Sequence, residues 1–144
     1  MLLRAFAVWC ALLVAAFVNG TFRELLLVPM FGGAAAHVVS TIILSGVIGI
    51  VVWRAIVWLH PATLHEAWLI GDGWVFLTIG FEFLAGHYLF GHTWDSLLAD
   101  YNVLQGRVWE LVLVTTLLAP IVSAWGHHLF HHVAPPRPMR HAHV

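Results

Sequence analysis

The chain has 144 residues, of which 61% are apolar and only 9% are charged, with a net charge of −1 when histidine is neutral. A water-soluble domain carries about 25% charged residues, so this composition cannot cover a globular surface in water. The near-zero net charge excludes the dense basic face that nucleic-acid binding needs. The length suits one domain and leaves no room for a separate catalytic module. We therefore expect an all-α protein whose solvent is lipid.

Four apolar segments are long enough to cross a bilayer, whose hydrocarbon core of about 30 Å needs roughly 20 helical residues. They cover residues 2–22, 37–59, 67–90 and 108–130. In lipid every backbone donor needs an internal partner, and segments of this length meet that need as helices. We predict a polytopic transmembrane four-helix bundle forming one domain over residues 1–130. A disordered, histidine- and proline-rich cytoplasmic tail is expected over residues 131–144.

The first segment also has the layout of a secretory signal, with Arg4 in the charged region and an apolar region over residues 5–18. Val18-Asn19-Gly20 is a poor cleavage site, which favours an uncleaved first span. Cleavage would leave three spans in the same orientation.

The arginines set the predicted orientation, because positive residues concentrate on the cytoplasmic side. With the N-terminus inside, four arginines lie inside and two outside: Arg4, Arg54, Arg137 and Arg140 against Arg23 and Arg107. The tryptophans fit this frame, since indole rings favour the headgroup level. We place five at the inner interface and two at the outer: Trp53, Trp58, Trp68, Trp74 and Trp125 against Trp94 and Trp109. Both ends of the chain are thus predicted to be cytoplasmic.

The connection between the third and fourth segments has the pattern of a short amphipathic helix lying in the interface. Its apolar side chains share one helical face and its polar side chains lie elsewhere. The residues that mark it are Trp94, Asp100, Tyr101 and Asn102. The connection over residues 23–36 is mostly apolar, so we expect it to stay in or on the membrane.

Two segments carry features that shape helix packing. The second has polar or small residues at intervals of four, which predicts close approach of another helix within the bundle. These residues are Gly33, His37, Thr41, Ser45 and Gly49. In the fourth segment Pro120 removes the hydrogen bond to Thr116, which predicts a kink. The hydroxyls of Thr115 and Thr116 are expected to help satisfy the backbone there.

A carboxylate at bilayer depth is the main functional pointer. Glu82 lies inside the third span, where a charged group costs roughly 2.5–3.5 kcal/mol and therefore normally faces protein or water. We predict a buried polar cluster in the outer half of the bundle, made of Glu82, Arg107, Glu110, Arg23 and His87. Such a cluster could bind a proton or ligand, or it could be a buried ion pair that fixes helix register.

Histidines concentrate at the predicted cytoplasmic end and suggest a metal site. His127, His128, His131 and His132 form two pairs spaced by four, so each pair shares a helix face and could grip one metal ion. The run over residues 128–132 is similar to one histidine box of membrane desaturases and hydroxylases. The other boxes of those families have no counterpart here, and an interfacial histidine end that binds metal only adventitiously is the main alternative.

Several short motifs lie in the third and fourth segments: residues 82–91 (EFLAGHYLFG), Trp94, residues 97–102 (LLADYN) and residues 106–109 (GRVW), with Asn19-Gly20 and Arg23-Glu24 before them. With these motifs the chain resembles a family of small uncharacterised bacterial four-span inner-membrane proteins. The resemblance implies a multi-pass protein of the bacterial inner, or plasma, membrane and no particular activity.

Three function classes follow from these features. The leading one is a small structural or accessory membrane protein, not an enzyme, whose polar cluster stabilises the bundle or a partner contact. The second is a small oligomeric transporter or proton-coupled permease that uses Glu82. The third is a metal-dependent membrane enzyme that uses the cytoplasmic histidines. We predict no cofactor apart from the metal ion of that third class. The expected partners are the lipid bilayer and a second copy or another membrane protein.

Overall fold

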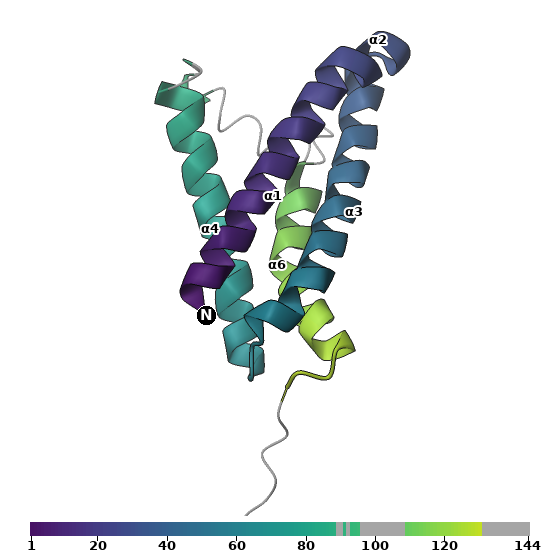
Figure 1. Ribbon diagram of the computed structural model, residues 1–144. Coiled ribbons are helices and arrows are strands. Elements are labelled where there is room, and N and C mark those ends of the chain that lie inside the picture. Colours follow the sequence, from purple (N-terminus) through teal and green to yellow (C-terminus); the bar gives the residue numbers. More distant parts are fainter. Residues whose placement is uncertain (89–90, 92, 96–108, 131–144) are drawn as a thin grey trace, which may run out of the picture.

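The computed structural model describes residues 1–88, 91, 93–95 and 109–130. These residues form helices, and no strand occurs among them. The four long helices are α1 (Leu2–Phe22), α3 (Gly33–Leu59), α4 (Leu64–Tyr88) and α6 (Trp109–Gly126). Figure 1 shows them side by side, with the N-terminus and the end of α6 at the same end of the bundle. The predicted all-α fold is confirmed. We call this end the N-terminal end and the opposite one the hairpin end.

Three helices in the described part of the chain are long and apolar enough to cross a membrane. They are Leu2–Phe31, Gly33–Leu59 and Leu64–Ala85. The fourth predicted segment contains a shorter apolar helix, Glu110–Gly126. The 18 residues of α6 rise about 27 Å at 1.5 Å per residue, slightly less than the hydrocarbon thickness.

The first span continues past its predicted end at residue 22. It runs through a π-helical turn, η1 (Arg23–Leu27), into the short helix α2 (Val28–Phe31). The widened turn ends two residues before Pro29, which has no N–H to donate to a regular helix. The helix stops at Gly32, whose φ of 78° lies in the region that glycine adopts without strain. The expected connection over residues 23–36 is therefore largely helical.

The turn between α3 and α4 is fixed by caps at both helix ends. His60 adopts a left-handed conformation and its N–H donates to the Ile56 carbonyl over 2.8 Å. Thr63 Oγ1 accepts from the Glu66 N–H (3.2 Å), and Glu66 Oε2 accepts from the Ala62 N–H (2.7 Å). This reciprocal arrangement resembles a capping box. It starts α4 at residue 64, three residues before the predicted start.

The end of α6 is also set by a cap, four residues before the predicted end. His128 has a φ of 53°, its N–H donates to Trp125 O, and the Leu129 N–H donates to Ala124 O. These two bonds form a Schellman motif with histidine at the position that usually holds glycine. Pro120 lies inside α6 as predicted. The neighbouring hydroxyls, however, bond the carbonyls of Leu111 and Val112 instead of the Thr116 carbonyl that Pro120 leaves unpaired.

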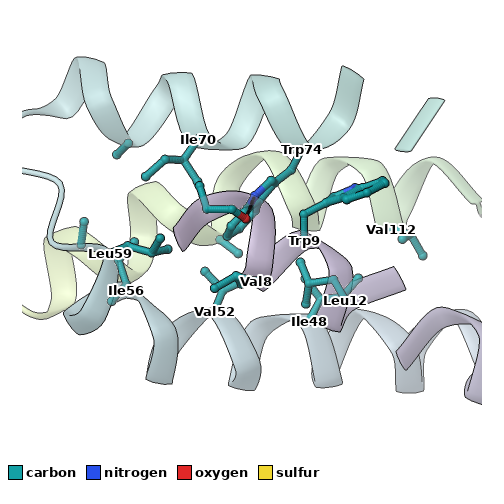
Figure 2. Close-up of a cluster of buried hydrophobic side chains, with 14 of the residues drawn as sticks. Val8, Trp9, Leu12, Ile48, Val52, Ile56, Leu59, Ile70, Trp74 and Val112 are labelled. Carbon is teal, nitrogen blue, oxygen red and sulfur yellow. Dashed lines mark hydrogen bonds between the residues drawn. The ribbon is translucent and has the colours of Figure 1, made fainter. Parts of the chain in front are cut away.

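Apolar side chains from all four long helices form the core. Figure 2 shows Val8, Trp9 and Leu12 of α1 among residues of α3 and α4. Trp74 is 1% exposed, and its indole N–H donates to Ala5 O over 2.8 Å. Trp74 is therefore buried between helices, and its predicted level at the inner interface stays a prediction. Trp9 makes a second bond between the same helices, donating to Thr78 Oγ1 over 3.1 Å.

Among the described glycines, close backbone approach occurs at Gly71 and not at Gly33 or Gly49 of the predicted row. A Cβ at position 71 would overlap the Leu117 carbonyl oxygen and lie 3.3 Å from Leu117 Cα. A Cβ at Gly33 or Gly49 would meet nothing within 4 Å. The row in the second segment therefore does not bring another backbone against its glycines, whereas α4 and α6 touch at backbone level.

Candidate functional site

The polar groups of the described chain gather at two places, and the first is the hairpin end. Arg23 lies in η1 and its guanidinium bridges two side chains. Nε and Nη2 each lie 3.1 Å from Glu24 Oε1, and Nη1 lies 3.3 Å from His37 Nδ1. Arg23 is 28% exposed and Glu24 is 62% exposed, so the guanidinium lies at the edge of the protein with one side turned inward. The bond to His37 joins η1 to α3 across the break at Gly32.

Glu110 occupies the first turn of α6 and is partly buried. Both of its carboxyl oxygens are buried and have no hydrogen-bond partner. Asn19 Oδ1 on α1 and Ser45 Oγ on α3 are also buried without a partner. A buried carboxyl without hydrogen bonds is unfavourable. Glu110 is therefore the largest departure from a fully satisfied core among the residues that the structure describes.

Glu82 and His87 lie in the second half of α4, and both are partly buried. The His87 ring stacks on Trp94, with centroids 4.1 Å apart, and meets Tyr88 edge-on at 4.9 Å. Phe83 also stacks on Trp94, at 6.3 Å. Trp94 therefore packs on the rings of Phe83 and His87 in the second half of α4.

Part of the predicted cluster and most of the predicted interfacial helix lie outside the described residues. Arg107, the expected partner of Glu82, is among these, as are Asp100, Tyr101 and Asn102 of the interfacial helix. The partners found for Arg23 are Glu24 and His37, neither of which belonged to the predicted set. The pairing of Glu82 with Arg107 stays a prediction.

The second polar region is the N-terminal end, where the predicted metal ligands would lie. His127 Nε2 is 3.2 Å from Trp53 O, and its ring packs on the Trp53 indole at 4.4 Å. His128 forms the left-handed cap described above. His131 and His132 lie outside the described residues. Within residues 1–88, 91, 93–95 and 109–130, no three histidine, cysteine or acidic side chains come together as a metal site would require.

Arg4 binds the C-terminal turn of α3 in the same region. Its Nη1 donates to Trp58 O over 3.0 Å, and its guanidinium carbon lies 5.3 Å from the centre of the Trp58 ring. A cation at a helix C-terminus is stabilised by the helix dipole, and the indole face adds a cation–π contact. Arg4 therefore has a structural role that its sequence position alone did not indicate.

A shallow apolar groove of about 400 Å³ lies between α3 and α6. It is lined by Gly49, Trp53, Val114, Thr115, Leu118, Ala119, Val122 and Ser123. None of the predicted cluster residues lines it. The groove is therefore separate from the polar groups at the hairpin end.

Several functional contacts were missed in the sequence, and one had a recognisable signal. Thr63-Leu64-His65-Glu66 is a capping-box sequence directly after Pro61, and it marks the start of α4. The contact between Arg23 and His37 had no local signal, because it depends on how η1 and α3 meet.

Comparison with known proteins gave no relative. A scan against protein-family models, a search of curated proteins and a search of solved structures each found no match to this chain. The resemblance to small four-span proteins therefore remains an expectation from the sequence.

Proposed function

We propose that this chain is an integral membrane protein with four spans, α1, α3, α4 and α6, and with both termini in the cytoplasm. Large apolar side chains cover the outside of the helices: Leu3 is 82% exposed, Phe76 80% and Trp125 73%. Lipid accommodates such a surface, whereas water does not. The N-terminus and the end of α6 lie at one end of the bundle (Figure 1), which supports an even number of spans. A short interfacial helix before α6 completes this proposal.

Within that membrane setting, we propose a structural or accessory role. The supporting observation is the pair of indole bonds that tie α1 to α4, from Trp74 to Ala5 O and from Trp9 to Thr78. The buried hydroxyls of Thr41 and Thr116 bond within their own helices, to His37 O and Val112 O, each over 2.8 Å. Polar side chains that bind within the bundle stabilise it and leave few groups for a substrate. The polar residues at the hairpin end would then stabilise the bundle or hold a partner.

One observation favours a second candidate, a small oligomeric transporter or proton-coupled permease. Glu110 has two buried carboxyl oxygens without partners, and Glu82 lies in the same half of the bundle. Acidic side chains at bilayer depth commonly mark ion or proton pathways. The metal-enzyme hypothesis would additionally need His131 and His132 to join His127.

The two leading roles are separated by one paired measurement on purified full-length protein. Glu82→Gln and Glu110→Gln are compared with the parent for thermal stability in detergent and for proton flux in liposomes. A structural role predicts lower stability for Glu82→Gln and no flux in any variant. Proton flux by the parent that Glu110→Gln abolishes at unchanged stability would overturn the structural role and support the transporter.

The topology is tested separately with single cysteines in a Cys10→Ser background. Leu3→Cys and Met30→Cys, which replace residues 82% and 69% exposed, should label from opposite sides of the membrane. Labelling of both from the same side would refute the proposed orientation of α1.

A further inference from the structure

A side-chain bond between Arg23 and His37 links α3 to the chain that follows α1, across an adaptable backbone. The helical path widens in η1, passes Pro29 in α2 and breaks at Gly32. Pi-helical turns and glycine breaks are places where a helix can change its path. Arg23 and His37 lie on either side of this stretch, 14 residues apart, and their side chains meet at 3.3 Å.

The chemistry of this bond fixes the protonation state of His37. A guanidinium has five N–H donors and no acceptor. Arg23 Nη1 must therefore donate, and His37 Nδ1 must offer its lone pair. The imidazole can do so only when Nδ1 carries no proton. If His37 takes up a proton there, the acceptor is lost and two cations face each other.

We propose that the Arg23–His37 bond is a pH-sensitive latch that holds the α1–α3 hairpin closed while His37 is neutral and releases it on protonation. Imidazole is the side chain whose charge ordinarily changes between about pH 5 and 8. The latch goes beyond the proposed structural role, because it adds a response to pH. It would act whichever compartment the hairpin end faces.

The charges around His37 are consistent with such a response. The elements packed against α3 are α1, η1, α2 and α6. Their charged or titratable side chains in the described residues at this end are Arg23, Glu24 and Glu110, while Arg4 and His127 lie at the other end and Cys10 lies between. From α4, Glu82 and His87 lie in the same half of the bundle. Glu24 contacts the Nε–Nη2 edge of Arg23 and leaves the Nη1 edge to His37.

The test measures distances between spin labels in the full-length Cys10→Ser protein in detergent. The reporter pair is Val18→Cys on α1 with Ile42→Cys on α3, at residues that are 64% and 59% exposed. The control pair, Leu3→Cys with Val57→Cys, lies at the N-terminal end, where Arg4 holds Trp58 O without an imidazole. Labels are attached at neutral pH before the samples are moved to about pH 8 or pH 5, the range in which imidazole titrates.

Acidification should lengthen the reporter distance by about 2–5 Å, the scale of helix shifts at packed contacts, and leave the control distance unchanged. His37→Asn supplies an acceptor oxygen near the place of Nδ1 and does not titrate, so its reporter distance should stay short at both pH values. His37→Leu supplies no acceptor and should be long at both. If this variant does not fold, as judged by helical circular dichroism, the comparison with His37→Asn decides alone. A reporter distance that ignores pH in the parent, or that lengthens equally in His37→Asn, overturns the proposal.

Discussion

Gly71 offers a direct test of how α4 packs against α6. Replacing it with alanine places a methyl group against the Leu117 backbone, with the new Cβ 3.2 Å from the carbonyl carbon and closer still to the oxygen. The obstacle is backbone and not the end of a flexible side chain, so relief requires α6 to move by about an ångström. Overpacking of this kind costs roughly 1–3 kcal/mol.

Gly73 provides the matched control, two residues along the same helix. A Cβ there meets nothing within 4 Å. Both substitutions gain the same helix propensity, about 1 kcal/mol relative to glycine. The stability difference between Gly71→Ala and Gly73→Ala therefore isolates the contact with Leu117. We expect Gly73→Ala to match or exceed the parent, and Gly71→Ala to fall about 1–3 kcal/mol below Gly73→Ala.

The assay is unfolding in mixed micelles with increasing dodecyl sulfate, followed by circular dichroism. Gly71→Ala should unfold at a lower denaturant fraction than Gly73→Ala. Equal midpoints for the two variants would refute the backbone contact between α4 and α6, and with it the way these two helices pack.

Three further predictions use the same assay. His128→Gly should stabilise the protein by about 1–2 kcal/mol, because glycine adopts the left-handed conformation without strain; no gain would contradict the Schellman cap. Trp74→Phe should lower the stability by about 2–3 kcal/mol, because the indole bond is lost and a cavity forms. The control Trp68→Phe, at a residue 38% exposed, should lower it by under about 0.5 kcal/mol. Similar losses of stability for the two variants would place Trp74 outside the core. Gly126→Ala should cost less than Gly71→Ala, since its obstacle is the Trp53 ring, which is 42% exposed and can rotate away; a larger cost would show that this ring is fixed.

The sequence predicted the helices well and their buried faces poorly, for one physical reason. A membrane helix is apolar toward lipid and toward protein alike, so hydropathy marks its existence without marking its inner side. Trp74 illustrates this, because an interfacial ring and a buried ring look the same in an apolar segment. Its burial is set by the meeting of α1 and α4, which no local pattern contains.

Some helix ends could be predicted from a capping sequence, and others could not. The start of α4 could have been predicted, because Thr63 and Glu66 have the spacing of a capping box. The end of α6 could not, since His128 takes a conformation that favours glycine and the apolar pattern continues to Phe130. The continuation of the first span through η1 was equally hidden, because Pro29 ordinarily marks a helix boundary and not a widened turn within a helix.

The pairing of side chains at the candidate site could not be predicted from the sequence. Acidic residues within apolar segments are visible in the sequence, and both carboxyl oxygens of the partly buried Glu110 are shielded from solvent. The partner of Arg23 was not visible, because Glu82 and His37 are both reasonable candidates until the hairpin geometry is known. In the sequence His37 belongs to a row of polar and small residues, and nothing local marks it as a partner of Arg23.

Among the described residues, the two ends of the bundle differ in how completely their polar groups are satisfied. At the N-terminal end, Arg4 binds the last turn of α3 and Glu66 caps α4, so the polar side chains there complete the fold. At the hairpin end, Glu110 and Asn19 keep buried oxygens without partners, and the bond between Arg23 and His37 depends on a titratable ring. Because unsatisfied buried polar atoms are unfavourable, a protein retains them where something else binds or where a change of state is required. A partner, a proton or a ligand should therefore act at the hairpin end, and substitutions there should alter function before those at the N-terminal end do.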